Sequence, residues 1–194
     1  MLFPLLAPLG REMGLAELQI TSIIAASSLT VFLAMPHWGR LSDGFGRKRI
    51  MMIGIFGFSA GTILFNSVLS FGLSGALLGL PLFVSLVVAR VMHAGVMSAT
   101  MPASTAYMAD ITDLHERTKG MGATGAANNV GAILGPAVAG LAFVSLLFPL
   151  WLMAALAFIN GLFIWRFLPE PPKPEIEGRR PPRMQYTDPG SCRS

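Results

Sequence analysis

Charged residues are scarce in the apolar parts of this sequence, so the few that occur there are the first candidates for chemistry. Arg90 lies inside a long apolar stretch, and His93 follows three residues later, about one helical turn away. A guanidinium in apolar surroundings is costly unless it faces a partner or a wet cavity. Arg90 is therefore either a functional buried charge or a structural arginine bonded to backbone carbonyls. His93 is either a group that titrates near neutral pH or a polar packing residue.

A second group of charges lies in a short segment, residues 39–49. Gly44 and Gly46 permit a tight reversal of the chain. Asp43 can accept hydrogen bonds from the start of a following helix and can pair with Arg47. The spacing predicts a compact polar corner between two helices, with a generic basic loop as the alternative.

Two further patterns imitate an active site and a metal site. Gly57, Ser59 and Gly61 have the spacing of a hydrolase nucleophile elbow, which requires a strand, a turn and acid and histidine partners. Here the pattern lies in a charge-free stretch, where the glycines favour a helix-packing face. A later loop contains potential metal ligands mixed with basic residues, which favours a solvated loop with helix caps: Asp110, Asp113, His115 and Glu116. The sequence predicts no enzyme, cofactor or metal site.

The elements that hold these residues are predicted from the apolar composition. Hydrophobic residues make up 53% of the 194 residues and charged residues only 12%, against roughly 25% charged in soluble domains. Mean hydropathy is +0.63. Residues 50–89 and 120–165 contain no charged residue and no histidine, and each stretch has room for about two crossings of ~20 residues. The composition therefore predicts a membrane protein.

Helices are the expected spanning elements, because lipid cannot satisfy exposed backbone groups and the alternation of a barrel strand is missing. A short apolar segment, residues 1–9, precedes them as the stub of a further helix. The five complete spans are predicted at residues 20–38, 50–70, 80–107, 120–141 and 147–167.

The positions of Lys and Arg predict the orientation in the membrane. Of the 14 basic residues, all except Arg11 and Arg90 lie in three segments, residues 40–49, 117–119 and 166–193. The positive-inside rule makes these segments cytoplasmic. They do not form the basic stripe of a nucleic-acid-binding protein. The chain then divides into a membrane domain, residues 1–168, and a Pro- and Arg-rich cytoplasmic linker, residues 169–194, expected to be extended or disordered.

The short basic segment resembles the signature that the major facilitator superfamily carries between its second and third helices. That signature reads Gly-x-Leu-(Ala/Ser)-Asp-x-x-Gly-Arg-(Lys/Arg). It is matched here by Gly39, Leu41, Asp43, Gly46, Arg47 and Lys48. In the family this loop is associated with conformational switching, so the resemblance implies that role for Asp43 and Arg47.

Arg90 fits the same resemblance. The fourth helix of the family carries an arginine that is implicated in proton coupling, followed by a glutamine and a glycine. This sequence has His93 and Ala94 at those two positions, with Gly95 one residue late. The resemblance implies a coupling role for Arg90 in a modified setting.

The predicted span at residues 120–141 resembles the Gly-x-x-x-Gly-Pro-x-x-Gly-Gly signature of drug and proton antiporters, and departs from it only at the final positions. Small residues four apart let helices approach closely, and a proline can kink the helix. The residues concerned are Gly131, Gly135, Pro136 and Gly140. Asn128 and Asn129 nearby are candidates for lining a cavity or for bonding between helices. The connection over residues 109–120 also resembles the tetracycline and multidrug antiporter branch.

The sequence thus predicts an all-α membrane protein, the N-terminal six-helix half of the major facilitator fold with a truncated first helix. The expected activity is proton-coupled export of small amphipathic molecules by alternating access, in a bacterial inner membrane. The expected partners are the substrate, protons, the bilayer and a C-terminal six-helix half, without nucleic acid. A sugar or organic-acid symporter or facilitator remains the alternative transporter. A non-transporting half or truncated membrane subunit is the alternative outside transport.

Overall fold

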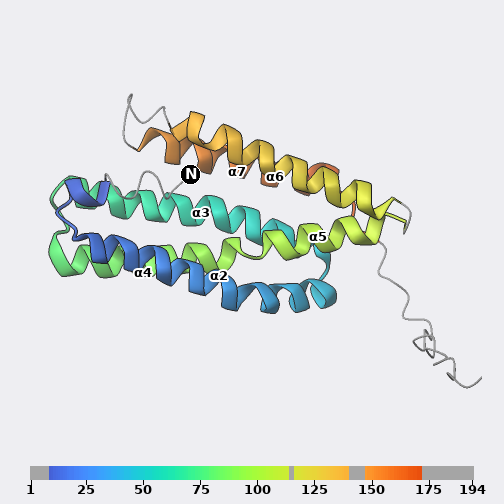
Figure 1. The fold of residues 1–194 in the computed structure, drawn as a ribbon, viewed down its shortest axis with the longest axis horizontal. Helices are drawn as coiled ribbons and strands as arrows, with labels where there is room; N and C mark the ends of the chain where they lie inside the picture. Colours follow the sequence, from blue (N-terminus) through green and yellow to red (C-terminus); the bar gives the residue numbers. More distant parts are fainter. Residues whose placement is uncertain (1–8, 114–115, 140–146, 172–194) are drawn as a thin grey trace, which may run out of the picture.

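The computed structural model describes residues 9–113, 116–139 and 147–171, and every regular element in them is a helix (Figure 1). After a helical turn at residues 9–12, the helices are α2 Glu17–Phe45, α3 Arg47–Leu73, α4 Gly79–Met97, α5 Thr100–Ile111, α6 Arg117–Ala139 and α7 Phe148–Phe167. The predicted all-α fold is confirmed. Most of the predicted N-terminal stub lies outside the described residues.

Four stretches are long and apolar enough to cross a membrane: Glu17–Phe45, Arg47–Leu73, Gly79–Ile111 and Phe148–Phe167. They match four of the five predicted spans, and the first three run a few residues further because their polar ends stay helical. The helix α6 covers most of the remaining predicted span, but its described part is less apolar. Residues 140–141 of that span lie outside the described chain.

The third predicted span is not one continuous helix, and this corrects the sequence-based expectation. It divides into α4 and α5 at a turn over Ser98 and Ala99. Pro102 explains the position of the break, because proline has no N–H to donate to the carbonyl of Ser98 and its ring crowds that carbonyl. The break makes α5 a separate short helix at one end of the bundle.

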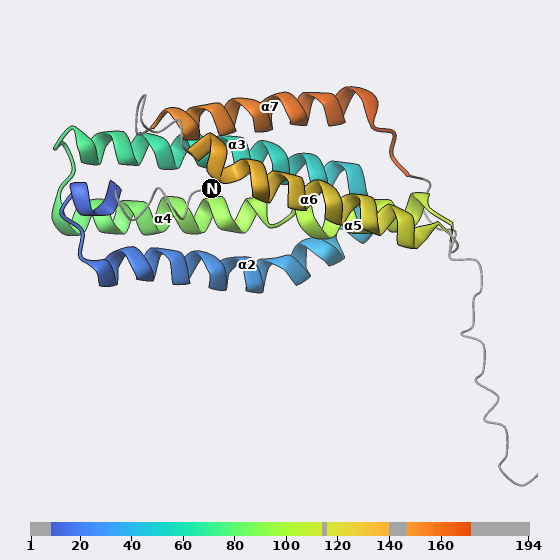
Figure 2. The same cartoon turned by 45° about the horizontal axis from the view of Figure 1, so that its top comes forward.

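The helix α3 lies in the middle of the bundle, between α7 on one side and α4 and α5 on the other (Figure 2). Glycines on α3 allow this close packing. A Cβ atom added to Gly54, Gly57 or Gly61 would come within 3 Å of Thr100, Val96 or His93.

The glycines that imitate a hydrolase elbow therefore form a helix-packing face, as predicted. Ser59 lies between them on α3 and is buried, and its hydroxyl donates to the carbonyl of Ala154 at 2.8 Å. That bond ties α3 to α7.

Two apolar clusters stabilise the described bundle. The larger includes Phe65, Leu69, Leu82 and Leu86, all fully buried. The smaller surrounds Ile50 at the other end of α3 and draws side chains from α2, α5 and α7. Along α4, the buried polar residues Arg90 and His93 lie between these clusters. Large apolar side chains also cover much of the outer surface, as expected where lipid is the solvent.

Candidate functional site

The turn between α2 and α3 is made by a single residue. Gly46 has φ of 105° and ψ of 139°, a backbone conformation that glycine adopts without strain. Gly44, which was expected to share in the reversal, lies within the last turn of α2 and has no positive φ. The reversal places Arg47 at the first position of α3.

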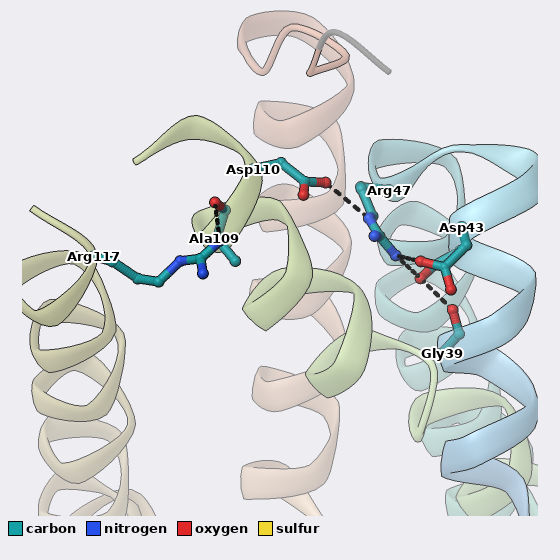
Figure 3. A network of polar contacts seen from close by, with 7 residues as sticks. Gly39, Asp43, Arg47, Ala109, Asp110 and Arg117 are labelled. Carbon is teal, nitrogen blue, oxygen red and sulfur yellow. Dashed lines mark hydrogen bonds and ion pairs between the residues drawn. The ribbon is translucent and has the colours of Figure 1, made fainter. Parts of the chain in front are cut away.

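Arg47 is the centre of a polar network that joins three helices (Figure 3). Its Nε donates to Oδ2 of Asp110 at 2.9 Å, and its terminal nitrogen donates to the hydroxyl of Ser42 at 2.7 Å and pairs with Asp43. The hydroxyl of Ser42 in turn donates to the carbonyl of Gly39 at 2.7 Å. One guanidinium therefore bridges the end of α2 and the end of α5.

The two carboxylates around Arg47 have different surroundings. The side chain of Asp110 is 20% exposed, close to the 17% of Arg47, while that of Asp43 is 64% exposed. The pairing of Asp43 with Arg47 is confirmed. The N-cap residue of α3 is Gly46, which has no side chain to cap the helix, and Asp43 contacts this helix end through its ion pair with Arg47.

Asp110 as the second partner of Arg47 was missed by sequence reasoning, which considered it only as a rejected metal ligand. The missed signal was its place at the end of a span whose orientation puts it on the same side of the membrane as Arg47.

The remaining residues of the corner bind backbone groups or pack closely. Lys48 donates from Nζ to the carbonyl of Trp165 at 2.9 Å, which links α3 to the end of α7. Tyr107 donates its hydroxyl to the carbonyl of Pro169 at 3.0 Å. Gly39 faces Pro102 of α5, which would lie 3.9 Å from an added Cβ. The corner thus gathers the ends of α2, α3, α5 and α7.

Arg90 lies far from this corner along the bundle, on α4. Both Arg90 and His93 are buried, with 6% and 1% of their surface exposed. A terminal nitrogen of Arg90 lies 3.1 Å from Nδ1 of His93. Arg90 also lines a cavity of about 270 Å³ together with Ser27, Ser28, Val31 and Met97. The structure therefore places this charge beside a space between α2 and α4.

The antiporter-like motif lies on α6, which packs against α5. Asn128 and Asn129 are exposed on this helix. A Cβ added to Gly131 would contact nothing within 4 Å, so the expected close approach of another helix is not found there in the described chain. The helix continues through Pro136 to Ala139, and Gly140 lies outside the described residues.

The chain is similar to known proteins over most of its length. The family model of the Major Facilitator Superfamily matches residues 1–189. The chain is 33% identical over 164 residues to Multidrug resistance protein 2 of Bacillus subtilis, an alignment that covers 84% of the chain and 38% of that protein.

Two further relatives have names that refer to other transported compounds. A triacylglyceride transporter of Mycolicibacterium hassiacum is 34% identical over 185 residues, 91% of the chain and 31% of that protein. Quinolone resistance protein NorA of Staphylococcus aureus is 27% identical over 179 residues, 92% of the chain and 43% of that protein. The chain spans less than half the length of these relatives. With its apolar helices and its match over residues 1–189, the chain belongs to the Major Facilitator Superfamily of membrane transporters.

Proposed function

We propose that this chain forms one half of a proton-coupled exporter of small amphipathic molecules that works by alternating access. The observation that carries the proposal is the bridge from Arg47 to Asp43 and Asp110, which joins the end of α2 to the end of α5. The printed names of two relatives, a multidrug and a quinolone resistance protein, support export. Because those relatives are longer, we propose that a second six-helix half completes the transporter.

The bridge is suited to a conformational switch. Hydrogen bonds to charged groups each contribute about 1.5–3 kcal/mol, enough to hold one arrangement of helix ends. The same amount is small enough for substrate or proton binding to offset, since ligands shift conformational equilibria by their differential affinity. Breaking the bond between Arg47 and Asp110 would remove the side-chain bridge between the α2–α3 corner and α5.

The basic corner also supports a proposed orientation. The α2–α3 turn, the start of α6 and the end of α7 lie at the same end of the bundle (Figure 1). These ends carry the three basic segments of the sequence. By the positive-inside rule, we assign this end to the cytoplasmic side of a bacterial inner membrane.

The remaining predicted roles belong to this proposal. Arg90 would support proton coupling from its place beside the cavity between α2 and α4. The roles of the α6 motif in packing and bending, and of its two asparagines in lining a cavity, stay predictions: Gly131, Gly135, Pro136, Gly140, Asn128 and Asn129. No step in this scheme needs a nucleotide or a metal.

A vesicle assay tests the proposal. The chain alone, and the chain joined to a second six-helix half of the same superfamily, would be reconstituted with an imposed pH gradient and ethidium as the amphipathic cation. We expect ethidium to move towards the acidic side only with the joined protein, and a protonophore to stop it. Movement with the protons would favour the symporter alternative, and transport by the unjoined chain would overturn the half-transporter proposal.

The resemblance to a triacylglyceride transporter favours a second candidate, export of a neutral lipid. The same vesicles can be loaded with a fluorescent triacylglycerol in place of ethidium. Gradient-driven movement of the lipid without movement of ethidium would assign the chain to this candidate.

A further inference from the structure

The contact between Arg90 and His93 fixes where the imidazole carries its proton. A guanidinium has five N–H donors and no acceptor, so Arg90 donates and Nδ1 of His93 accepts across their 3.1 Å contact. An imidazole whose Nδ1 accepts is neutral and carries its proton on Nε2. That Nε2 atom is buried and has no hydrogen-bond partner among the described residues.

The ring of His93 is held in place by α3. A Cβ added to Gly61 would lie 2.8–2.9 Å from three atoms of the histidine side chain, so only glycine leaves room for it. Phe58 makes an edge contact with the ring, with 5.1 Å between the ring centroids. The imidazole therefore occupies a fitted place between two helices and lies next to Arg90.

Arg90 faces the cavity between α2 and α4, and His93 is not among the cavity-lining residues. The hydroxyls of Ser27 and Ser28 line the same cavity and do not titrate near neutral pH. From α3, the groups against the ring are Phe58 and Gly61, which carry no charge. Among the described contacts of the ring, the one with a charged group is the contact with Arg90.

From this geometry we infer that His93 is a proton-binding site that positions Arg90, a role that rests on and deepens the proposed proton coupling. A proton taken up at Nδ1 converts the ring to imidazolium, which has N–H groups on both nitrogens and can no longer accept from Arg90. Only the hydrogen bond breaks, and Arg90 keeps its own proton. Two neighbouring cations then repel each other, so the guanidinium moves towards the cavity. A second positive charge there disfavours an amphipathic cation, so proton and substrate compete.

Nitrogen-15 NMR of the histidine- and arginine-labelled chain in lipid nanodiscs tests this inference. At neutral pH we expect the Nε2–H tautomer of His93 to dominate by on the order of tenfold. On acidification we expect both ring nitrogens to become protonated and the Arg90 side-chain signals to shift at the same midpoint. His37 is an internal control, because its exposed ring lies on α2 and bonds to the carbonyl of Leu33, so changes in its ring signals should not be accompanied by changes at Arg90.

Variants of Arg90 complete the test, with helix content by circular dichroism as the check on folding. Arg90→Met removes the donor, so the tenfold preference of His93 for the Nε2–H tautomer should disappear. Arg90→Lys keeps a cationic donor and should retain part of it. A dominant Nδ1–H tautomer in the unmodified chain, or Arg90 signals that do not respond when His93 is protonated, would overturn the inference.

These spectra require no transport, so the two proposals can fail separately. The expected spectra from a chain whose joined form does not move ethidium would support His93 as the proton site and remove the export proposal. Gradient-driven export together with an Nδ1–H tautomer would do the reverse.

Discussion

The bundle contains two arginines with low exposure whose partners differ in charge. Arg47 binds two carboxylates at the end of the bundle, where three helices meet. Arg90 lies within the apolar part of α4 and donates to a neutral imidazole. The two carboxylates neutralise the charge of Arg47 and hold the helix ends together, which suits a contact that stabilises one conformation. The hydrogen bond to the imidazole orients Arg90, which suits a group that responds to a proton or a ligand.

Among the substitutions that test this comparison, replacing Arg47 is expected to have the largest effect on stability and export. Arg47→Ala leaves the largely buried carboxylate of Asp110 without its cation, which should lower the unfolding free energy of the chain by about 2–3 kcal/mol. In the joined transporter, ethidium export should fall roughly tenfold or more, because the side-chain bridge from the corner to α5 is lost. Thermal unfolding in detergent micelles and the vesicle assay measure the two effects.

The matched control is Arg47→Lys, which keeps the charge but loses the planar fork that reaches both carboxylates. It should lie between the unmodified protein and Arg47→Ala in both measurements. If Arg47→Ala unfolds at the same temperature as the unmodified chain, the polar network around Arg47 does not stabilise the corner.

The next largest effect is expected at Gly61, on the Arg90 side of the comparison. Gly61→Ala drives a methyl group into the ring of His93 and should cost about 1–3 kcal/mol through overpacking. Gly44→Ala is the matched control, because Gly44 is also helical and has open space around it. Alanine there should be neutral or stabilise the helix by up to about 1 kcal/mol. Equal loss of stability in the two variants, measured by thermal unfolding, would show that the ring is not tightly held.

The sequence predicted the membrane helices well, because charge-free stretches and basic loops are local signals. It also predicted the pair of Asp43 and Arg47, which are four residues apart across one turn. It could not predict the bond between Arg47 and Asp110, since those residues are joined only by the packing of α5 against α3. The break before α5 was likewise missed, although Pro102 gave a local reason for it.

The contact between Arg90 and His93 could also be predicted only in part from the sequence. The spacing of Arg90 and His93 was visible as one helical turn, but the tautomer of the imidazole depends on which ring nitrogen faces the guanidinium. The glycine that accommodates the ring lies on α3 and has no sequence link to His93. Such contacts between helices are set by the three-dimensional packing.

A smaller effect is expected at Asp110, where a substitution can separate the charge of the contact with Arg47 from its geometry. Asp110→Asn keeps an oxygen acceptor for Nε of Arg47 but removes the negative charge. The unfolding free energy should fall by about 1–2 kcal/mol, because a charge-assisted hydrogen bond becomes a neutral one in a site that is only 20% exposed. Thermal unfolding at low ionic strength gives the value. A loss as large as that of Arg47→Ala would mean that charge alone holds the corner.

The smallest effect is expected at Asp43, because its carboxylate is the more exposed partner of the same guanidinium. With 64% of its side chain exposed, it is solvated in both the paired and the unpaired state. Asp43→Asn should therefore lower the unfolding free energy by less than about 1 kcal/mol, and added salt should reduce the difference further. If Asp43 acts mainly in switching, Asp43→Asn should nevertheless reduce ethidium export by the joined transporter by a larger factor than this small loss of stability would explain. Thermal unfolding across a salt series, run beside Asp110→Asn, measures the ranking, and a larger loss at Asp43 than at Asp110 would reverse the order of importance argued from burial.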